Sequence, residues 1–452
     1  MNENGCHLMI ESKYNHYFRM DDGARLAFNA MSCGLALTDE RYYELLSVLK
    51  GINCESDVPC NLKETYEAAR AGHFIVDNEC DELGEYLTIR HKLMSQRKNL
   101  GLTIAPTLDC NFKCIYCYEN RREGVMDQAT MNGIVRFVSR QATVIKNLRV
   151  IWYGGEPLLA PSIVSNLSKC LLEVCSRNEI TYESFIITNG SLIDAGIVKM
   201  LVDSKVKGAQ ITLDGPRDIH DKRRVLRNGG SSFDTILNGI QLLVTAGINV
   251  NIRVNVDKSN DDRTEELVSD LAQRIDLHKV RIGLGRVVKY SAACKVAESE
   301  CFSNKAFALR QIVFNTMLKR HGFDERILFP FPKPKPLFCS AERENSFVID
   351  PYGFLYKCWN TIGNPDYAIG NVGDTVDWQS KGMCQEWLAR DFRKESKCGS
   401  CKFLPICAGG CPYMAIVADA NRCDGVRYNL DALVQEYYKK FLREGSASPN
   451  KE

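Results

Sequence analysis

Polar and apolar residues alternate with two different periods in the first part of the chain. Between residues 12 and 37 the period is two, on either side of an Asp-Asp-Gly at 21–23, which is typical of a β-hairpin. A short apolar run at 73–77 indicates one more strand. Apolar residues recur at helical spacing in three segments, 40–49, 62–71 and 81–96. Strands and helices in this order predict a winged-helix-like module over residues 1–97, with Asp39 as the N-cap of its first helix.

From residue 102 the pattern changes to short apolar runs, each followed by a helical segment. The runs lie at 102–108, 148–154, 183–189, 208–215, 249–257 and 279–285. Strands that alternate with helices form parallel sheets, because each helix returns the chain to the same end of the sheet. We therefore expect an α/β fold, with a partial (β/α)6 barrel over residues 98–328.

A proline-rich stretch at 329–338 follows the last of these units. Proline fixes φ and removes a hydrogen-bond donor, so this stretch is expected to be extended and to mark a domain boundary. Residues 329–429 are rich in cysteine and poor in long periodic segments, and they are expected to form a separate domain. Residues 430–452 are expected to form a polar helix and a tail.

Composition and charge exclude several kinds of partner. The 58 basic residues nearly balance the 56 acidic ones, and both signs are interspersed along the chain. The sequence thus predicts no face for nucleic acid. The first residues lack a basic region that leads into an apolar run, and no apolar stretch reaches the roughly 18 residues needed to cross a bilayer. We expect a cytoplasmic protein without a membrane partner.

Cysteine is unusually common, with 20 residues that concentrate in one trio and in the last third. In a long chain without an export signal, such groups more often bind metal than form disulfides. Cys110, Cys114 and Cys117 follow the first strand of the predicted barrel. Zinc is one alternative, but a structural zinc site takes four protein ligands and this loop has no histidine. Three thiolates on a [4Fe–4S] cluster leave one iron open for the methionine part of a sulfonium cofactor, which would be cleaved to a 5′-deoxyadenosyl radical.

The trio, with Tyr116 before its third cysteine, resembles the radical S-adenosylmethionine (SAM) superfamily. Gly154-Gly155-Glu156-Pro157 follows the second predicted strand and matches that superfamily's motif for the methionine amino group. The resemblance implies a TIM-like radical SAM barrel, a catalytic [4Fe–4S] cluster and SAM. It also implies cofactor contacts from the ends of later strands, at Thr188, Asn189, Thr212 and Arg253.

Each of these strand-end residues has an ordinary alternative. The glycine-containing segments could be simple turns between strand and helix, and Arg253 could form a structural ion pair inside the barrel. Tyr118 and Asp214 lie in the predicted mouth and are candidate catalytic residues that remain to be tested. Active sites of such barrels lie at the C-terminal ends of their strands.

Seven further cysteines occur in an order that resembles the SPASM extension of sulfatase maturases, quinone-cofactor maturases and enzymes that modify ribosomal peptides. The resemblance implies two auxiliary [4Fe–4S] clusters, hence three clusters in all. The second auxiliary cluster would be bound by Cys398, Cys401, Cys407 and Cys423, and the first by Cys339, Cys358 and Cys411.

The first auxiliary cluster thereby lacks one protein ligand. Cys384, Cys301 or Cys294 could supply it. Alternatively, the open iron could bind a cysteine thiolate of the substrate beside the carbon that loses hydrogen. Four cysteine ligands on that cluster in the substrate-free enzyme would contradict the second hypothesis.

Residues 12–95 resemble the winged-helix element that binds leader peptides in many peptide maturases; a structural cap on the barrel is the alternative. In sulfatase maturases an Asp follows the cysteine equivalent to Cys358, whereas Trp359 stands here. We therefore expect a maturase of the sactipeptide or ranthipeptide type. It would form thioether cross-links in a Cys-rich precursor peptide, with an external low-potential electron donor such as flavodoxin or ferredoxin. The alternatives are a formylglycine-generating sulfatase maturase, a maturase that forms carbon–carbon or carbon–oxygen cross-links, and a noncatalytic electron relay.

Overall fold

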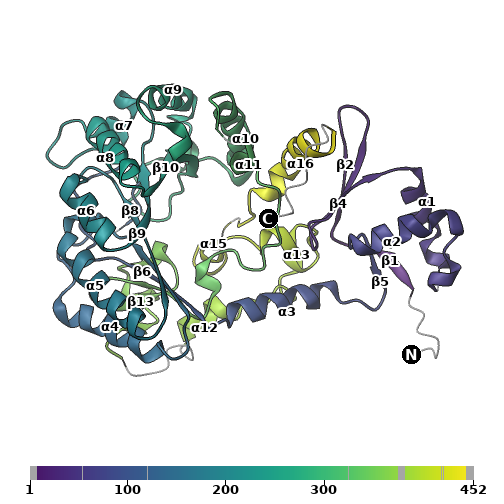
Figure 1. Ribbon diagram of the computed structural model, residues 1–452, viewed down its shortest axis with the longest axis horizontal. Coiled ribbons are helices and arrows are strands. Elements are labelled where there is room, and N and C mark those ends of the chain that lie inside the picture. Colours follow the sequence, from purple (N-terminus) through teal and green to yellow (C-terminus); the bar gives the residue numbers. More distant parts are fainter. Residues whose placement is uncertain are drawn as a thin grey trace.

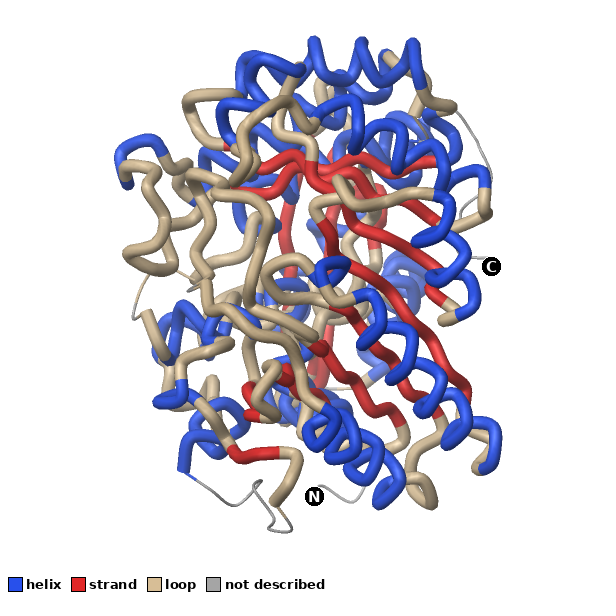
Figure 2. Tube along the Cα trace, turned by 90° about the vertical axis from the view of Figure 1, so that its left-hand side faces the viewer, coloured by secondary structure: helices blue, strands red, loops and turns tan. Residues whose placement is uncertain are grey.

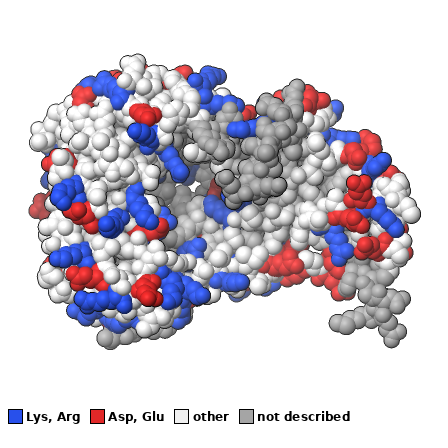
Figure 3. Space-filling view, in the orientation of Figure 1, with Lys and Arg blue, Asp and Glu red and all other residues white. Residues whose placement is uncertain are grey.

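The computed structural model describes residues 8–52, 54–119, 121–323, 325–374, 382–418, 420 and 422–443. Lys, Arg, Asp and Glu side chains are intermixed on the face shown in Figure 3. Within the described part, no helix combines the length and the apolar character needed to cross a bilayer.

The N-terminal module contains the expected hairpin. Its central sheet is antiparallel and consists of β2 (Asn15–Arg19), β3 (Arg25–Asn29) and β4 (Leu35–Thr38). The predicted turn closes with a hydrogen bond from the Met20 amide to the Ala24 carbonyl at 2.8 Å. A second pair of strands, β1 (Met9–Glu11) and β5 (Ile75–Asp77), is also antiparallel.

Three α-helices occur in the described part of this module, and all three were expected: α1 (Glu40–Val48), α2 (Lys63–Ala71) and α3 (Glu82–Met94). Asp39 caps α1 as predicted, because its Oδ1 accepts a hydrogen bond from the Tyr42 amide at 3.0 Å. Figure 1 shows α3 running from this module to the rest of the molecule.

The large sheet contains the six predicted parallel strands, side by side in chain order. They are β6 (Asn99–Ile104), β7 (Asn147–Trp152), β8 (Thr181–Thr188), β9 (Val206–Thr212), β10 (Asn249–Val256) and β11 (Val280–Arg286). In the described residues β11 pairs only with β10, so the sheet is open and the barrel is partial. The α/β fold expected from the alternating pattern is confirmed.

Helices lie along the outer side of this sheet (Figures 1 and 2). They are α4 (Gln128–Gln141), α5 (Pro161–Arg177), α6 (Ala195–Asp203), α7 (Arg217–Arg223), α8 (Phe233–Thr245) and α9 (Thr264–Arg274). Their apolar faces bury side chains against the strands in one core that includes Trp152, Ile186 and Phe233.

Three short strands extend the sheet beyond β6, which the sequence pattern did not predict. β12 (Ser346–Ile349) pairs with β6 in parallel, and β13 (Phe354–Tyr356) and β14 (Gly370–Asn371) follow as antiparallel neighbours. They are only two to four residues long, too short for a periodic signal. They attach the cysteine-rich segment to the edge of the parallel sheet.

The remaining helices are short except for the first and the last. They are α10 (Asn304–Arg320), α11 (Glu325–Leu328), α12 (Gly382–Leu388), α13 (Ser396–Gly399), α14 (Leu404–Cys407), α15 (Pro412–Ile416) and α16 (Val426–Tyr437). The terminal helix thus begins at Val426 rather than at residue 430, and a π-helical stretch, Tyr438–Arg443, continues it. Residues 444–452 of the expected tail lie outside the described part.

The N-terminal sheet shares a hydrophobic core with the C-terminal segment. Tyr14 and Phe28 pack in one cluster with Phe392, Leu404 and Val434, and all five side chains are buried. The N-terminal module is therefore attached to the segment that carries the last cysteines, as well as to α3.

Candidate functional site

The loop 110–117 begins shortly after β6 ends and is fixed by backbone hydrogen bonds to the end of α7 and the residues that follow it. The Lys113 amide donates to the Val225 carbonyl at 2.7 Å, and the Ile115 amide donates to the Arg223 carbonyl at 3.1 Å. The loop is thus held at the C-terminal ends of the parallel strands, where the barrel prediction places an active site.

The thiols of Cys110, Cys114 and Cys117 influence one another electrostatically, since a charge on Cys114 raises the pKa of both others. Burial is the main cause, and it raises the pKa of Cys110 and of Cys117 to about 12. Such thiols stay neutral until a metal displaces their protons. Among the described residues, no three His, Cys, Asp or Glu side chains are close enough to hold a single metal ion. Three neighbouring thiols of this kind suit a multi-iron cluster, in which each iron binds its own thiolate.

Two glycines allow the Gly-Gly-Glu-Pro turn to pack against this loop. A Cβ on Gly154 would lie 2.4 Å from the Thr107 carbonyl oxygen, and one on Gly155 would lie 2.2 Å from that of Asp109. The Glu156 amide then joins the turn to the loop, because it donates to the Asp109 carbonyl at 2.9 Å. Glycine at both positions is therefore a steric requirement for placing Glu156 beside the trio.

Glu156 joins the turn to the end of β8. Its fully buried carboxylate accepts hydrogen bonds from the Thr188 hydroxyl at 2.7 Å and from the Asn189 amide at 2.7 Å. The Asn189 side-chain amide lies 4.0 Å from the Cys110 sulfur. Burial raises the pKa of Glu156, and these donors partly offset the rise. The structure thus brings three predicted cofactor contacts, Glu156, Thr188 and Asn189, together next to the trio. Lone pairs on their oxygen atoms can accept from a further donor such as an amino group.

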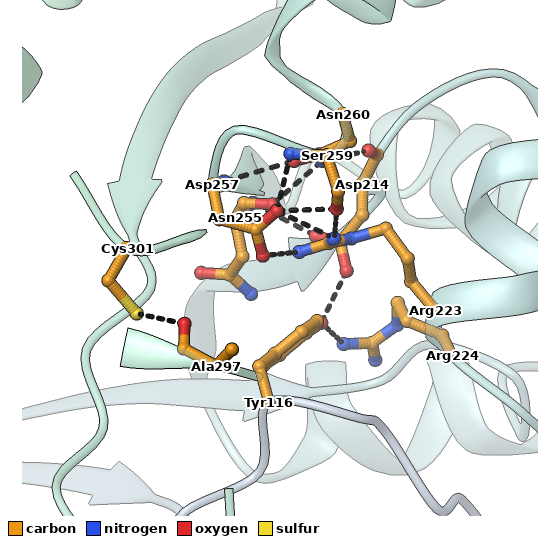
Figure 4. A network of polar contacts seen from close by, with 10 residues as sticks. All are labelled: Tyr116, Asp214, Arg223, Arg224, Asn255, Asp257, Ser259, Asn260, Ala297 and Cys301. Carbon is orange, nitrogen blue, oxygen red and sulfur yellow. Dashed lines mark hydrogen bonds and ion pairs between the residues drawn. The ribbon is translucent and has the colours of Figure 1, made fainter. Parts of the chain in front are cut away.

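A second network lies on the other side of the loop (Figure 4). The Tyr116 hydroxyl donates to Asp214 at 2.5 Å and accepts from Arg224 at 2.8 Å. The other Asp214 oxygen accepts from the Asn255 amide at 2.9 Å. Burial raises the pKa of Asp214, whereas Arg224 and Arg223 lower it. Both oxygens of this candidate catalytic residue are engaged, so in this structure Asp214 connects the loop to β10.

Thr212 and Arg253 face each other in the register of β9 and β10. Arg253 forms no ion pair with any described residue; its Nε donates to the Asn255 side chain at 2.7 Å. The guanidinium covers Gly285 of β11, where a Cβ would lie 2.3 Å from Nε. Its charge lowers the pKa of Tyr290, which places Arg253 near the mouth. The structural ion pair considered as its alternative role is absent from the described part, and its contact with a cofactor stays a prediction.

Aromatic side chains connect the trio loop to the cysteine-rich segment. The Tyr118 and Tyr153 hydroxyls lie 2.6 Å apart, and the Tyr118 ring meets Tyr290 edge-on at 5.3 Å. Tyr290 in turn meets Tyr413 at 5.3 Å. Beside them, burial raises the pKa of the Glu119 carboxyl to about 7. No sequence pattern pointed to Glu119, because a single Glu after the motif forms no pattern and its burial depends on distant segments.

Cys339, Cys358 and Cys411 are brought together although the sequence separates them widely. Charges on Cys339 and Cys411 each raise the pKa of Cys358, and a charge on Cys411 raises that of Cys339. Burial is the largest cause in both cases and raises the pKa of Cys339 to about 12. The three thiols of the predicted first auxiliary cluster are therefore neighbours.

The candidates for a fourth ligand occupy different places. Cys384 is buried on α12, which contacts both η8 (Ser340–Glu342) and α15, the elements that directly follow the first and third of these cysteines. Cys294 and Cys301 lie in a small apolar cluster beside the trio loop. By its position, Cys384 is the strongest candidate from the protein itself.

The last cysteines lie beside two arginines to which no sequence motif pointed. Arg427 donates to the sulfur of Cys401 at 3.9 Å and to that of Cys423 at 4.0 Å. Arg422 donates to the sulfur of Cys398 at 3.8 Å. The predicted ligand set forms one group in space: Cys398, Cys401, Cys407 and Cys423. Its basic neighbours suit an anionic iron–sulfur cluster.

Two relatives of this chain are named as sulfatase-maturating enzymes. The chain is 25% identical over 340 residues to a cysteine-type anaerobic sulfatase-maturating enzyme of Clostridium novyi, over 70% of this chain and 88% of that protein. It is 22% identical over 369 residues to a serine-type anaerobic sulfatase-maturating enzyme of Bacteroides thetaiotaomicron, over 74% of this chain and 86% of the other.

Two solved structures share the fold. The enzyme anSMEcpe with bound AdoMet and Cp18Cys peptide superposes with a TM-score of 0.59 at 20% identity, over 75% of this chain and 99% of that one. SuiB of Streptococcus suis bound to its precursor peptide SuiA has a TM-score of 0.51 at 17% identity, over 89% of this chain and 95% of the other. Finally, residues 104–271, which hold the trio loop, the Gly-Gly-Glu-Pro turn and the four parallel strands β7 to β10, match the sequence model of the Radical SAM superfamily. The chain therefore contains a radical SAM domain.

Proposed function

We propose that the chain is a peptide maturase that forms thioether cross-links in a ribosomally made precursor. SAM at the cluster of the trio supplies a carbon radical that can take a hydrogen atom from the peptide. The residues at the ends of β7 and β8 would orient the methionine part of SAM, through the carboxylate of Glu156 and the neighbouring Asn189. The protein's own task is to hold one peptide carbon and one cysteine sulfur next to each other at this mouth.

The observation that carries the proposal is the arrangement of two thiol groups around one mouth. The set of Cys339, Cys358 and Cys411 is joined to the trio loop by contacting aromatic rings, and Tyr118 interacts electrostatically with both Cys117 and Cys358. A peptide between them would have the hydrogen-abstraction site on one side. On the other side, the second set would hold an auxiliary cluster able to bind a substrate thiolate. If Cys384 were the fourth ligand, no iron of that cluster would be open to a substrate thiolate, and this binding step could not occur.

The N-terminal module supports a peptide substrate. A cavity of about 790 Å³ lies along β5 and is lined by Met9, Tyr66, His73 and Ile75 among others. Exposed edges of short sheets bind extended peptides through main-chain hydrogen bonds, while adjacent pockets take side chains. The structure of SuiB with its precursor peptide covers 89% of this chain, and that of anSMEcpe with a bound peptide covers 75%. We infer that the module binds the leader of the precursor.

The proposal is tested with the peptides encoded by any short Cys-rich reading frames that lie beside the gene. Each peptide is incubated anaerobically with the iron-loaded enzyme, SAM and dithionite, and then analysed by mass spectrometry. We expect 5′-deoxyadenosine and a peptide that has lost two hydrogen atoms per cross-link. The carbon hydrogen would go to 5′-deoxyadenosine, the thiol hydrogen would leave as a proton, and the remaining electron would pass to the auxiliary cluster. The cross-linked cysteines should resist alkylation. Products with free thiols would contradict the proposal.

The second candidate is a formylglycine-generating sulfatase maturase, which the sequence relatives favour. Trp359 weighs against it, because the resemblance places the catalytic Asp of those enzymes at this position. The same assay with a sulfatase-derived peptide that carries a central Cys or Ser separates the two functions. Formation of an aldehyde that reacts with a hydrazine probe would establish the second candidate.

A further inference from the structure

A small cavity of about 190 Å³ lies between the trio loop and the cysteine-rich segment. Tyr118 and Glu119 form one side, directly after the third cysteine of the trio. Trp359, next to Cys358, lies on another side. Pockets for whole small molecules measure about 300–1,000 Å³, so this cavity suits a single side chain.

Glu119 is the acidic residue among those that line this cavity. Its Oε2 is buried and has no hydrogen-bond partner among the described residues. The Tyr153 hydroxyl acts as a donor to the carboxyl, and Tyr153 is itself bonded to Tyr118. No Lys, Arg or His is among the residues that line the cavity. Buried carboxylates are normally paired, because an isolated charge is costly away from water. Among the described residues, this site therefore has an acidic group without a cationic partner.

The walls of the cavity also suit a cationic group. Five aromatic side chains line the cavity: Tyr118, Tyr290, Trp359, Tyr367 and Tyr413. Trp359 is 41% exposed and stacks on the Tyr153 ring, with centroids 5.6 Å apart and planes 25° apart. Aromatic faces attract ammonium and guanidinium groups, most strongly where water is excluded. Aliphatic stems of Lys and Arg also pack well along aromatic rings.

We propose that this cavity is a specificity pocket for a Lys or Arg side chain of the substrate, paired with Glu119. The inference rests on the proposed function only in that the substrate is a peptide entering this mouth. Because Glu119 lies two residues after Cys117, a cation anchored here fixes the peptide relative to the trio. The pocket therefore selects which neighbouring carbon is presented for hydrogen abstraction. Glu119 is a positioning residue in this scheme.

The test uses the full-length, iron-loaded enzyme with SAM and a panel of blocked pentapeptides, four of whose residues are Ala. The central residue is Lys, Arg, norleucine, Glu or Cys, and dissociation constants are measured by isothermal titration calorimetry. We expect the Lys and Arg peptides to bind about tenfold or more tightly than norleucine. Glu119→Gln, which keeps the size and removes the charge, should bring that ratio close to one. Trp359→Leu, at a partly exposed position, should reduce the ratio while leaving the norleucine affinity similar.

Glu265→Gln on α9, an exposed position far from the cavity in the sequence, serves as the matched control and should leave the ratio unchanged. Iron content and visible absorption show whether each variant has loaded its clusters. Equal binding of the Lys and norleucine peptides, no binding by any peptide, or an undiminished ratio in both variants would overturn the pocket. If Glu119→Gln lowers SAM affinity without changing the ratio, the carboxylate serves the cofactor and the inference is wrong. None of these readouts requires a cross-link, so they are independent of the thioether assay.

Discussion

Single side chains hold the parts of the site together, and Glu156 is one of them. It connects the Gly-Gly-Glu-Pro turn to Thr188 and Asn189 while lying beside Cys110. If the carboxylate also binds SAM as proposed, changes there will act on two measurable quantities, SAM affinity and stability.

Replacing Glu156 with Gln should weaken SAM binding by about tenfold or more and destabilise the fold by roughly 1–3 kcal/mol. An amide cannot accept from all of these donors, and a mismatched buried group has this cost. Equilibrium dialysis with labelled SAM and urea unfolding measure the two effects. Glu183→Gln on β8 is the control, since that side chain is 41% exposed. Normal SAM affinity in the Glu156 variant would refute its assigned role.

Gly155→Ala should prevent the turn from packing against the trio loop, because the added Cβ would lie 2.2 Å from a backbone oxygen. We expect a lower iron content after reconstitution and loss of 5′-deoxyadenosine formation. Gly283→Ala on β11 is the matched control, as nothing lies within 4 Å of its Cβ position. Full iron loading in the Gly155 variant would show that the loop can adapt.

For single residues, the sequence predicted several of the side chains that come together, and the structure shows which atoms form the hydrogen bonds. Thr188 and Asn189 follow from the ends of parallel strands, which always share one edge. The bond from Tyr116 to Asp214 does not, because it depends on the angle at which the loop crosses the sheet. Glu119 was missed for a similar reason: its surroundings come from Tyr153 and from a segment 240 residues further along, near Trp359.

Among the elements, α3 has an unusual link to the cysteine-rich segment. Arg90 on this helix forms a completely buried ion pair with Glu342 at 2.6 Å, and it also donates to the Pro336 carbonyl at 3.0 Å. Its guanidinium lies 4.8 Å from the Phe392 ring centroid. The helix therefore positions the segment that begins at Cys339, three residues before Glu342.

Arg90→Met should cost about 3–5 kcal/mol in unfolding free energy, since it leaves a buried carboxylate without its partner. Changing Glu342 to Leu as well should recover part of that loss, because no charge is then left unpaired. Urea denaturation followed by circular dichroism measures both. Arg97→Met, in an exposed pair with Glu344, should change stability by less than about 1 kcal/mol. A similar loss of unfolding free energy in the Arg90 and Arg97 variants would show that burial of the Arg90–Glu342 pair is not the cause.

The order and type of the main strands and helices followed from periodicity, and the six parallel strands are confirmed. Strands β12, β13 and β14 could not be anticipated. They are short, and their pairing partners lie far away in the chain. The start of α16 was also placed too late, because Val426 and its neighbours continue the helix into a segment without apolar periodicity.

On the scale of the whole molecule, the N-terminal sheet is docked onto the C-terminal segment through His16. This ring is buried, lies 4.5 Å from the Phe403 ring, and has Nε2 3.1 Å from the Lys402 carbonyl. Burial lowers the pKa of His16 to about 4. The docking surface therefore holds a neutral histidine at neutral pH.

The sign of the pH dependence follows from proton uptake. Between pH 6.5 and about 4 the unfolded chain binds a proton at His16 and the folded chain does not, so stability falls as the pH falls through this window. The loss should be on the order of a few kcal/mol. In His16→Phe this part of the pH dependence should vanish, as measured by unfolding at pH 7, 6 and 5. An unchanged slope in the variant would assign the effect to other groups.

The shared core of the N-terminal sheet also constrains how the protein is made. Tyr14 and Phe28 leave the ribosome early, but Phe392, Leu404 and Val434 follow only after most of the chain has been synthesised. Contacts so distant in sequence form slowly, and exposed apolar surface invites aggregation in the meantime. The early sheet is therefore expected to depend on chaperones until translation ends. Its completion would then coincide with the arrival of Cys398–Cys423, so that docking of the first module and loading of the last cysteines become one late step of maturation.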